Sequence, residues 1–535
     1  KEDADYLTSS DPRTDLRILT VADYTFILNR NKKVVMTSAK SPNSFLTQGA
    51  LIHVKQGQYG RTYKIWIDGA LMASFETPDG SDKSHTKMID TSYIVGQLAA
   101  SLNSYLSTNS LTGKYSVETG DCWLRVTGAS KVATQDGFNN QAMIGLTSYV
   151  QRFNLLPATA PDGYCVKVKG DPNGDNAGSY YVQYSKDDTV WEECVAPNMP
   201  ITIDASTMPH ALIREADGSF VFQRVAWTDR KIGDDDSNPY PSFIDHTLND
   251  IFFFRNRLGL LSGENVILSE SAEYFNFWMT TANDIQDTDC IDVPTTTTRI
   301  NILHYAVPFN EELYCFSDST QFVLRSDTVL SPKNTALIEV TGFNSSPDCK
   351  PVVAGKNLYF SSLRSEYTSI KEYYNVQQVT DVKNAQDITS HVSSYIPNGV
   401  YQITPNTNEN IMLFLTTGDQ NCIYIYKYLF INENRVQASW SKWNMQGHVF
   451  GAFFINSTLY VLVNRGNKHM LEKINFTYNT QDFPEIEPYR VYLDSKKQAS
   501  TGVYNSTYER TEYNLKTEYN LTDISHISKV GFVLS

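Results

Sequence analysis

Three adjacent carboxylates are the residues of this chain best suited to chemistry: Asp234, Asp235 and Asp236, in the run GDDDSNPYP. Neighbouring carboxylates could hold a divalent cation, or serve as the acid and the base of a glycosidase. Consecutive residues in a loop bounded by glycine and proline point in different directions, however, so they do not readily converge on one ligand. We therefore favour a solvated acidic loop. A divalent-cation site and hydrolysis of polysaccharide or peptidoglycan are the alternatives.

A second acidic run, DPNGDNAG at 171–178, resembles the start of a calcium-binding loop. Counted from Asp171, the twelfth position is Val182, where an EF-hand loop requires a glutamate that binds the ion through both oxygens. A turn stabilised by its own asparagine and aspartate side chains is the better interpretation.

Two tryptophans in the segment ASWSKWN, Trp440 and Trp443, could stack against a sugar ring. This carbohydrate-binding hypothesis requires both side chains to be exposed. Within a repeated array of strands, tryptophans more often pack in the core, and we favour that interpretation.

Familiar catalytic and phosphate-binding motifs are absent from the sequence. The chain contains no GxSxG, HExxH, GxxxxGKS, GxxxxGKT or GxGxxG pattern. The 9 histidines are scattered, and the 7 cysteines are dispersed and never spaced CxxC, which favours buried reduced thiols. We predict no catalytic residue, no metal ligand, no cofactor and no enzymatic activity.

Charge and composition limit the partners and the fold class. The net charge of −14 argues against a protein that grips nucleic acid through a basic surface. No apolar run approaches the roughly 18–20 residues that a membrane-spanning helix needs. The abundant aromatic residues, 33 tyrosines and 26 phenylalanines, favour β structure.

The first part of the chain predicts a strand at 24–29 and, after it, an inserted α+β domain. Three extended segments between 50 and 78 precede the run DTSYIVGQLAASLNSYL at 90–106, in which apolar residues recur every four positions. This spacing is typical of an amphipathic helix, and Asp90 or Thr91 can provide its N-cap. Two further extended pieces complete the domain.

From about residue 210 one pattern recurs: an apolar strand, a polar turn and a second apolar strand. The strands do not alternate apolar with polar residues, so both faces of each hairpin are expected to be buried. The repeat interval of roughly 45–55 residues is close to that of a β-propeller, whose repeats consist of strands alone. Five hairpins begin near the following apolar positions: Leu258, Leu313, Leu358, Met412 and Leu459.

We therefore predict a mainly β chain with an irregular β-propeller-like domain, and with an ordinary β-sandwich as the alternative. Each of the five hairpins is expected in a different blade, and a pair of strands within 211–227 could belong to another blade. The chain begins with Lys1 and ends in the strand-like KVGFVLS, so we expect it to be incomplete at both ends. The expected parts are an N-terminal β segment at 1–48, a small α+β domain at 49–155, a β meander at 156–205, a β-propeller-like domain at 206–485 and the start of a further β domain at 486–535.

Several long segments resemble the tail tubular protein B family, the nozzle proteins of T7-like short-tailed bacteriophages. The most characteristic is PSFIDHTLNDIFFFRNRLGLLSGENVILSESAEYFNFW at 241–278, and the resemblance covers nearly the whole chain. Its motifs are architectural and carry no catalytic residue. Family members begin earlier and continue well beyond residue 535, which implies that the tip of the nozzle is absent here. Further similar segments are LTVADYTFILNRNKKV at 19–34, TDCIDVP at 288–294, AVPFNEELYCFSDSTQFVL at 306–324 and CKPVVAGKNLYFSSLRSEYTSIKEYY at 349–374.

The resemblance implies a structural protein of the virion, assembled in the host cytoplasm. Six copies would form a tube below an adaptor ring of tail tubular protein A, tail fibres would attach at that junction, and genomic DNA would leave through the lumen. It assigns no residue to the wall of the lumen. Because the chain is acidic, we expect a neutral or acidic lumen that DNA passes without specific binding.

Overall fold

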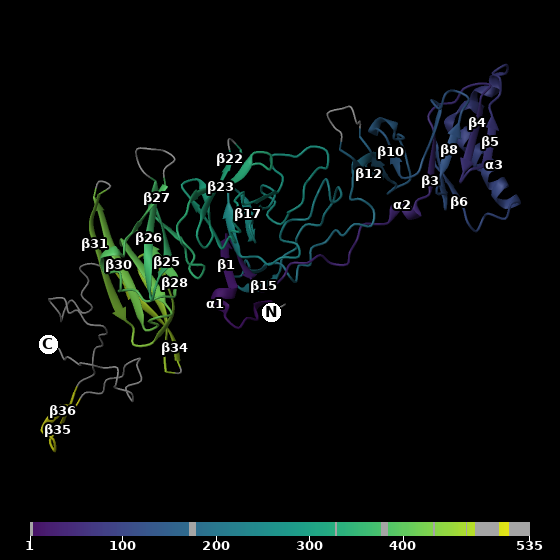
Figure 1. Cartoon of the computed structure of the whole chain (residues 1–535). Helices are drawn as coiled ribbons and strands as arrows, with labels where there is room; N and C mark the ends of the chain where they lie inside the picture. The colour runs from purple at the N-terminus through teal and green to yellow at the C-terminus, as the bar shows by residue number, and fades with distance from the viewer. Residues whose placement is uncertain are drawn as a thin grey trace. The chain divides into compact units, whose positions relative to one another are not determined.

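The computed structural model describes residues 4–170, 178–326, 329–375, 383–431, 434–466, 468–476 and 502–512. These residues form separate, mostly antiparallel sheets and one long helix, as Figure 1 shows. The prediction of a mainly β chain is confirmed. The chain divides into two compact units, residues 1–344 and 345–535, and each is described by itself.

The first sheet of unit 1 joins the start of the chain to residues far along it. β2 forms a hairpin with β1 and also pairs with β14, which in turn pairs with β15. The strand predicted at 24–29 and the pair predicted within 211–227 are both confirmed. The residues between β2 and β14 are therefore an insertion. The sheet consists of β1 (Leu16–Val21), β2 (Tyr24–Asn29), β14 (His210–Arg214) and β15 (Phe220–Arg224).

The predicted helix within the insertion is α3 (Thr91–Thr108), and the residues it buries are those of the predicted apolar stripe, including Ile94, Leu98 and Leu102. Asp90 occupies the N-cap position, but its side chain makes no capping hydrogen bond. The helix packs into one apolar core with the surrounding strands. These strands are β3 (Ala50–Val54), β4 (Thr62–Ile67), β5 (Ala70–Glu76), β6 (Ser116–Thr119), β7 (Trp123–Thr127), β8 (Val132–Gln135) and β9 (Met143–Leu146).

The meander that follows is confirmed in its three antiparallel strands, β11, β12 and β13. A short strand, β10, adds to it in the parallel direction. The bounds are β10 (Tyr149–Val150), β11 (Cys165–Val168), β12 (Tyr180–Ser185) and β13 (Val190–Glu193). Short helices elsewhere are η1 (Ala4–Leu7), α1 (Pro12–Asp15), α2 (Ser44–Thr47), η2 (Lys83–Ile89), η3 (Phe153–Leu155) and η4 (Ser390–Val392).

From residue 250 onward, antiparallel sheets follow one another in chain order, and each of the five predicted hairpins lies in a different sheet. In unit 1 the strands are β16 (Asp250–Phe254), β17 (Arg257–Ser262), β18 (Asn265–Leu268) and β19 (Ile291–Pro294), then β20 (Tyr305–Phe309), β21 (Glu312–Phe316), β22 (Gln321–Ser326) and β23 (Thr335–Thr341).

Unit 2 continues the same pattern with two four-stranded sheets, a three-stranded sheet and a separate hairpin. The first two sheets contain β24 (Val352–Ala354), β25 (Asn357–Arg364), β26 (Tyr367–Asn375) and β27 (Lys383–Asp387), then β28 (Val400–Asn406), β29 (Ile411–Thr416), β30 (Cys422–Ile431) and β31 (Asn434–Asn444). The remaining strands are β32 (His448–Ile455), β33 (Thr458–Arg465), β34 (Lys468–Asn475), β35 (Val503–Asn505) and β36 (Arg510–Glu512).

Alternate residues of β17 pack on opposite sides of their sheet. Leu258 and Leu260 lie in a cluster with residues of β2 and β14, whereas Leu261 lies in a cluster with residues of β21 and β22. Both faces are therefore buried, as the missing alternation predicted. A Cβ at position 259 would lie 2.2 Å from the ring of Phe252 on β16, so any residue other than glycine requires that buried ring to move.

The sheet β28–β31 of unit 2 is buried on both faces in the same way. Met412 and Phe414 pack with the sheet β24–β27, whereas Leu413 and Leu415 pack with β32 and β33. In each unit, then, three successive sheets pack in chain order, which differs from the two facing sheets of the β-sandwich alternative. The five leading positions, Leu258, Leu313, Leu358, Met412 and Leu459, are all buried.

Candidate functional site

The three adjacent carboxylates diverge. One oxygen of Asp234 accepts hydrogen bonds from the amides of Asp236 (3.2 Å) and Ser237 (3.1 Å) and from the Ser237 hydroxyl (2.9 Å). This carboxylate therefore closes its own turn. Its other oxygen lies 3.9 Å from Nζ of Lys167.

Asp235 is paired with a buried cation. Nη1 and Nη2 of Arg230 each lie 3.2 Å from one carboxylate oxygen of Asp235, and the Arg230 side chain is fully buried. The guanidinium also donates to the Asn238 carbonyl at 2.5 Å and lies over the rings of Tyr240 (5.2 Å) and Trp278 (5.4 Å). Asp235 thus neutralises a charge that burial would otherwise make costly.

The third carboxylate, Asp236, is exposed. The three carboxylates have different partners and do not converge on a common ligand position. The geometry therefore supports the acidic-loop interpretation. Among the described residues, no group of three or more His, Cys, Asp and Glu side chains is placed to hold a metal ion.

The structure also describes part of the calcium-like run and both tryptophans of the carbohydrate-binding hypothesis. Residues 171–177 of the calcium-like run lie outside the described residues, while Val182 is buried in β12. Trp440 is partly buried against the core of unit 2 and donates from Nε1 to the Ile388 carbonyl at 3.1 Å. Trp443 stacks on Phe476 at 5.9 Å between ring centroids. Both tryptophans therefore pack against residues of neighbouring sheets within unit 2, in agreement with the core interpretation.

Sequence reasoning missed three buried charges that hold loops or strands in place. The first is Arg257, which begins β17 and is 2% exposed. Its guanidinium donates to five backbone carbonyls and so fastens three separate loops to one strand; burial lowers its pKa. The carbonyls are those of Ser269 (2.7 Å), Asp287 (2.9 Å), Thr288 (3.1 Å), Asp289 (2.6 Å) and Leu330 (3.3 Å).

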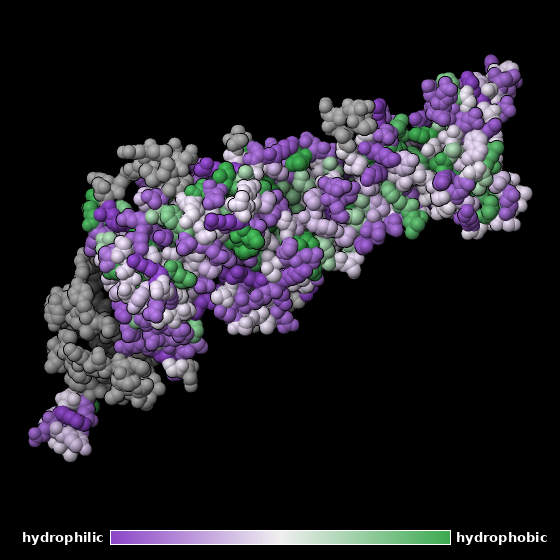
Figure 2. All heavy atoms as spheres, in the orientation of Figure 1, coloured by the Kyte–Doolittle hydropathy of each residue, from purple (hydrophilic) through white to green (hydrophobic). Residues whose placement is uncertain are grey.

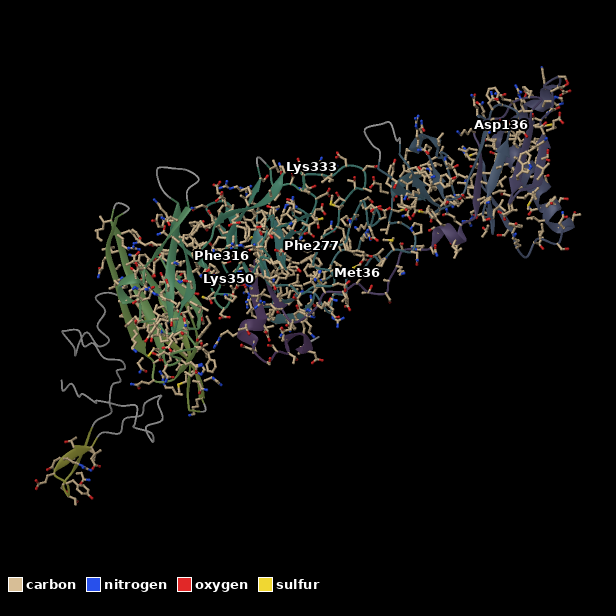
Figure 3. All side chains as sticks on the ribbon, viewed as in Figure 1. Met36, Asp136, Phe277, Phe316, Lys333 and Lys350 are labelled. Atoms are coloured by element: carbon tan, nitrogen blue, oxygen red, sulfur yellow. The ribbon has the colours of Figure 1, made fainter. Side chains whose placement is uncertain are left out.

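The second is Asp136, which is labelled in Figure 3 and lies in the α+β domain with no exposed surface. Four backbone amides donate to its carboxylate: those of Phe138 (2.7 Å), Asn140 (2.9 Å), Ala142 (2.6 Å) and Met143 (3.0 Å). Burial by itself raises the pKa of Asp136, but the four amide donors outweigh it and the pKa is lowered.

The third is Glu372 on β26, which is 4% exposed. One of its oxygens accepts from the Tyr359 hydroxyl (2.5 Å) and from Nδ2 of the Asn357 side chain (2.8 Å), and the other accepts from Nη1 of Arg435 at 2.6 Å. Arg435 belongs to β31, so this ion pair joins two successive sheets. Burial lowers the pKa of Arg435, but Glu372 beside it raises the pKa overall.

The first strands of successive sheets lie beside one another within each unit. β16 contacts both β1 and β20 in unit 1, and β28 contacts both β24 and β32 in unit 2. Polar side chains link these strands: Nη2 of Arg17 donates to the Tyr305 hydroxyl at 3.1 Å, and Asp250 accepts from the amide of Ala306 at 3.0 Å.

The surface in the view of Figure 2 is mostly hydrophilic, with hydrophobic residues in small separate areas. In the part of the chain that the structure describes, no helix has the length and hydropathy to cross a membrane.

Residues 1–531 match the family described as "Bacteriophage nozzle protein". The chain is also 42% identical over 528 residues to a protein of Escherichia phage T7 named "Tail tubular protein gp12". That match covers 96% of this chain and 65% of the T7 protein, so the chain spans about two thirds of its relative's length.

Solved structures give weaker similarities. A putative 6-phosphogluconolactonase of Bacteroides uniformis is 11% identical, with a TM-score of 0.30, over 56% of this chain and 92% of its own. Hsv2 of Kluyveromyces marxianus is 8% identical, with a TM-score of 0.31, over 63% of this chain and 94% of its own. Neither similarity is strong enough to support an argument about the fold.

Proposed function

Because this chain belongs to the bacteriophage nozzle protein family, we propose that it is a structural component of a phage tail and forms the tube through which genomic DNA is ejected. The match over residues 1–531 is the observation that carries this proposal. The 42% identity to a tail tubular protein along 96% of the chain supports it. The protein would accordingly be part of the virion, assembled in the host cytoplasm.

The repeated sheets are proposed to be the blades of an irregular β-propeller-like domain over residues 206–485. Three features support this within each unit: antiparallel sheets that follow one another in chain order, apolar residues on both faces, and first strands that contact those of the next sheet. The α+β domain at 49–155, the meander at 156–205 and the N-terminal segment at 1–48 complete the proposed organisation. Of the start of a further β domain expected at 486–535, all but residues 502–512 lie outside the described residues.

The proposed partners are those of a tail tube: five further copies of the chain, an adaptor ring of tail tubular protein A, tail fibres, and DNA that passes without specific binding. Electron microscopy of the purified chain, alone and mixed with the adaptor ring protein, tests this assembly. Six-fold rings below the adaptor are expected. A chain that stays monomeric in both samples would contradict the proposal.

A catalytic role is not proposed. The carboxylates that could have formed a hydrolase site close a turn, pair with a buried arginine, or face solvent. A turnover assay on polysaccharide and peptidoglycan should detect no cleavage. Cleavage that disappears when Asp234, Asp235 and Asp236 are changed together to asparagine would establish the hydrolase alternative instead.

A further inference from the structure

Two cysteines touch one another inside unit 1. Sγ of Cys165 lies 3.7 Å from Sγ of Cys194, and the two residues are 3% and 6% exposed. Cys165 begins β11 and Cys194 directly follows β13, so the thiols lie on the chain segments that flank β12 on its two sides. Both cysteines are free.

Backbone and side-chain contacts hold the two residues in place without any bond between the sulfurs. The Gln48 side chain accepts from the amide of Cys165 (2.9 Å) and donates to its carbonyl (2.7 Å). The amide of Cys194 donates to the Tyr181 carbonyl (2.9 Å), and its carbonyl accepts from the amide of Gly233 (3.0 Å). A disulfide, with sulfurs about 2.05 Å apart, requires the side chains to shift from this contact.

We propose that Cys165 and Cys194 are a redox-dependent pair, reduced in a reducing compartment and joined in a disulfide after exposure to a peroxide. One thiol sulfur attacks hydrogen peroxide and becomes a sulfenic acid, releasing one water. The second thiol attacks that sulfur and releases the other water. Two electrons pass from the sulfurs to the peroxide oxygens, so two thiols and one hydrogen peroxide give one disulfide and two waters. This inference does not depend on the proposed role in a tail.

The burial of the two thiols predicts that the disulfide forms slowly and is stable once formed. The hydrogen bond with Cys165, together with burial, raises the pKa of Cys194, so its reactive thiolate is scarce at neutral pH. Oxidation therefore waits for a local opening of the meander. Once closed, the bond ties β11 to the segment after β13 and reduces the freedom of the unfolded chain, which stabilises this sheet.

Peptide mapping of the folded full-length chain tests the pair. The chain is treated with hydrogen peroxide, alkylated, and digested with trypsin without reduction. The peptides 153–167 and 187–214 should be found linked, and the link should disappear after reduction. The variant Cys122→Ser should keep the link, because the Cys122 thiol contacts the Thr159 hydroxyl at 3.0 Å and is not one of the two thiols in contact. The variant Cys165→Ser should lose it.

Urea unfolding of the same wild-type sample gives a second readout. The oxidised chain should unfold at a higher urea concentration than the reduced chain, and Cys194→Ser should show no such redox-dependent shift. Oxidation of either cysteine to sulfonic acid without the link, or links to Cys122 or Cys290 in the folded wild-type chain, would overturn the proposal. Because peptide mapping uses the wild-type protein, a variant that fails to fold does not affect this test.

Discussion

Arg257 shows how this chain uses a buried charge, because its guanidinium donates to five backbone carbonyls. These bonds give the loop carbonyls a charged donor, including the buried carbonyls of Ser269, Asp289 and Leu330. One side chain thereby fixes the path of residues 269, 287–289 and 330 around β17. We assign this site a structural role, and its effect is measured as a change in the free energy of unfolding.

Replacing Arg257 with methionine keeps the apolar stem and removes every donor. We expect the free energy of unfolding to fall by about 2–4 kcal/mol, because several buried carbonyls lose a charged partner. Urea titration followed by tryptophan fluorescence measures the change. Arg255→Met is a matched control, since Arg255 is exposed and its guanidinium donates to the Glu311 carbonyl at the surface. An equal loss in both variants would contradict the role given to Arg257.

Asp136 gives a residue-scale prediction with a defined pH dependence. Asp136→Asn should lower the free energy of unfolding by about 1–3 kcal/mol at neutral pH, since a neutral amide cannot accept from four backbone donors equally well. The folded-state pKa is lowered, so the contribution of the carboxylate is fully present above its unfolded value near 3.9 and is lost as the pH falls through the folded pKa.

Chemical unfolding at neutral pH and at successively lower pH checks this sign. Wild type and Asp136→Asn should differ most at neutral pH and converge in acid. Asp121→Asn serves as the control, because Asp121 is an exposed carboxylate in the same domain. A difference between wild type and Asp136→Asn that grows as the pH falls would show that the amide donors do not dominate.

At the scale of elements, Leu313 and Leu358 test whether the hairpins are core strands. Both are fully buried, in β21 and β25. Changing either to alanine should cost about 2–5 kcal/mol through lost apolar contact and an unfilled cavity. Leu363→Ala on the same strand as Leu358 is the control, because Leu363 is 59% exposed. A loss below about half a kcal/mol at the buried positions would contradict their role in the core.

The pair of Glu372 and Arg435 tests how successive sheets are coupled. Arg435→Ala should destabilise unit 2 by about 3–5 kcal/mol, since it leaves a buried carboxylate without its cation. Combining it with Glu372→Gln should restore part of that loss, because the uncompensated charge is gone. A double-mutant cycle from urea unfolding measures the coupling. Strictly additive losses would mean that the ion pair does not connect the two sheets.

The sequence predicted the elements that depend on local contacts, and it missed the features that depend on contacts between residues far apart in the chain. The five hairpins, the strand at 24–29 and the helix stripe are set by local periodicity and short turns, and all were found where they were expected. The pairing of β2 with β14 spans the whole inserted region, and no local pattern specifies it. The buried roles of Arg257, Asp136 and Glu372 also arise from distant packing; the one local hint was a charge at the start of an apolar strand in RNRLGLL.

For the whole molecule, the relation to DNA follows from charge. Each phosphate held by Lys or Arg releases counterions and tightens binding, so a tube lined with such contacts would retain the duplex instead of letting it slide through as proposed. This chain carries 59 acidic and 45 basic residues, a net charge of −14. Repulsion from an acidic wall decays over a Debye length of about 8–10 Å at physiological salt, enough to keep duplex off the wall of a narrow tube.

We therefore expect no appreciable affinity for duplex DNA at about 150 mM salt, and a neutral or acidic lumen in the assembled tube. Fluorescence anisotropy of a labelled duplex, titrated with the chain and with the assembled ring at low and physiological salt, measures this. A reversed-charge variant in which the exposed carboxylates Asp236 and Asp121 become lysines controls for sensitivity, since added cations should raise the signal at low salt. Micromolar or tighter binding by the wild type at physiological salt, weakening steeply as salt is added, would show that the tube holds DNA through phosphate contacts, and free sliding would then need another explanation.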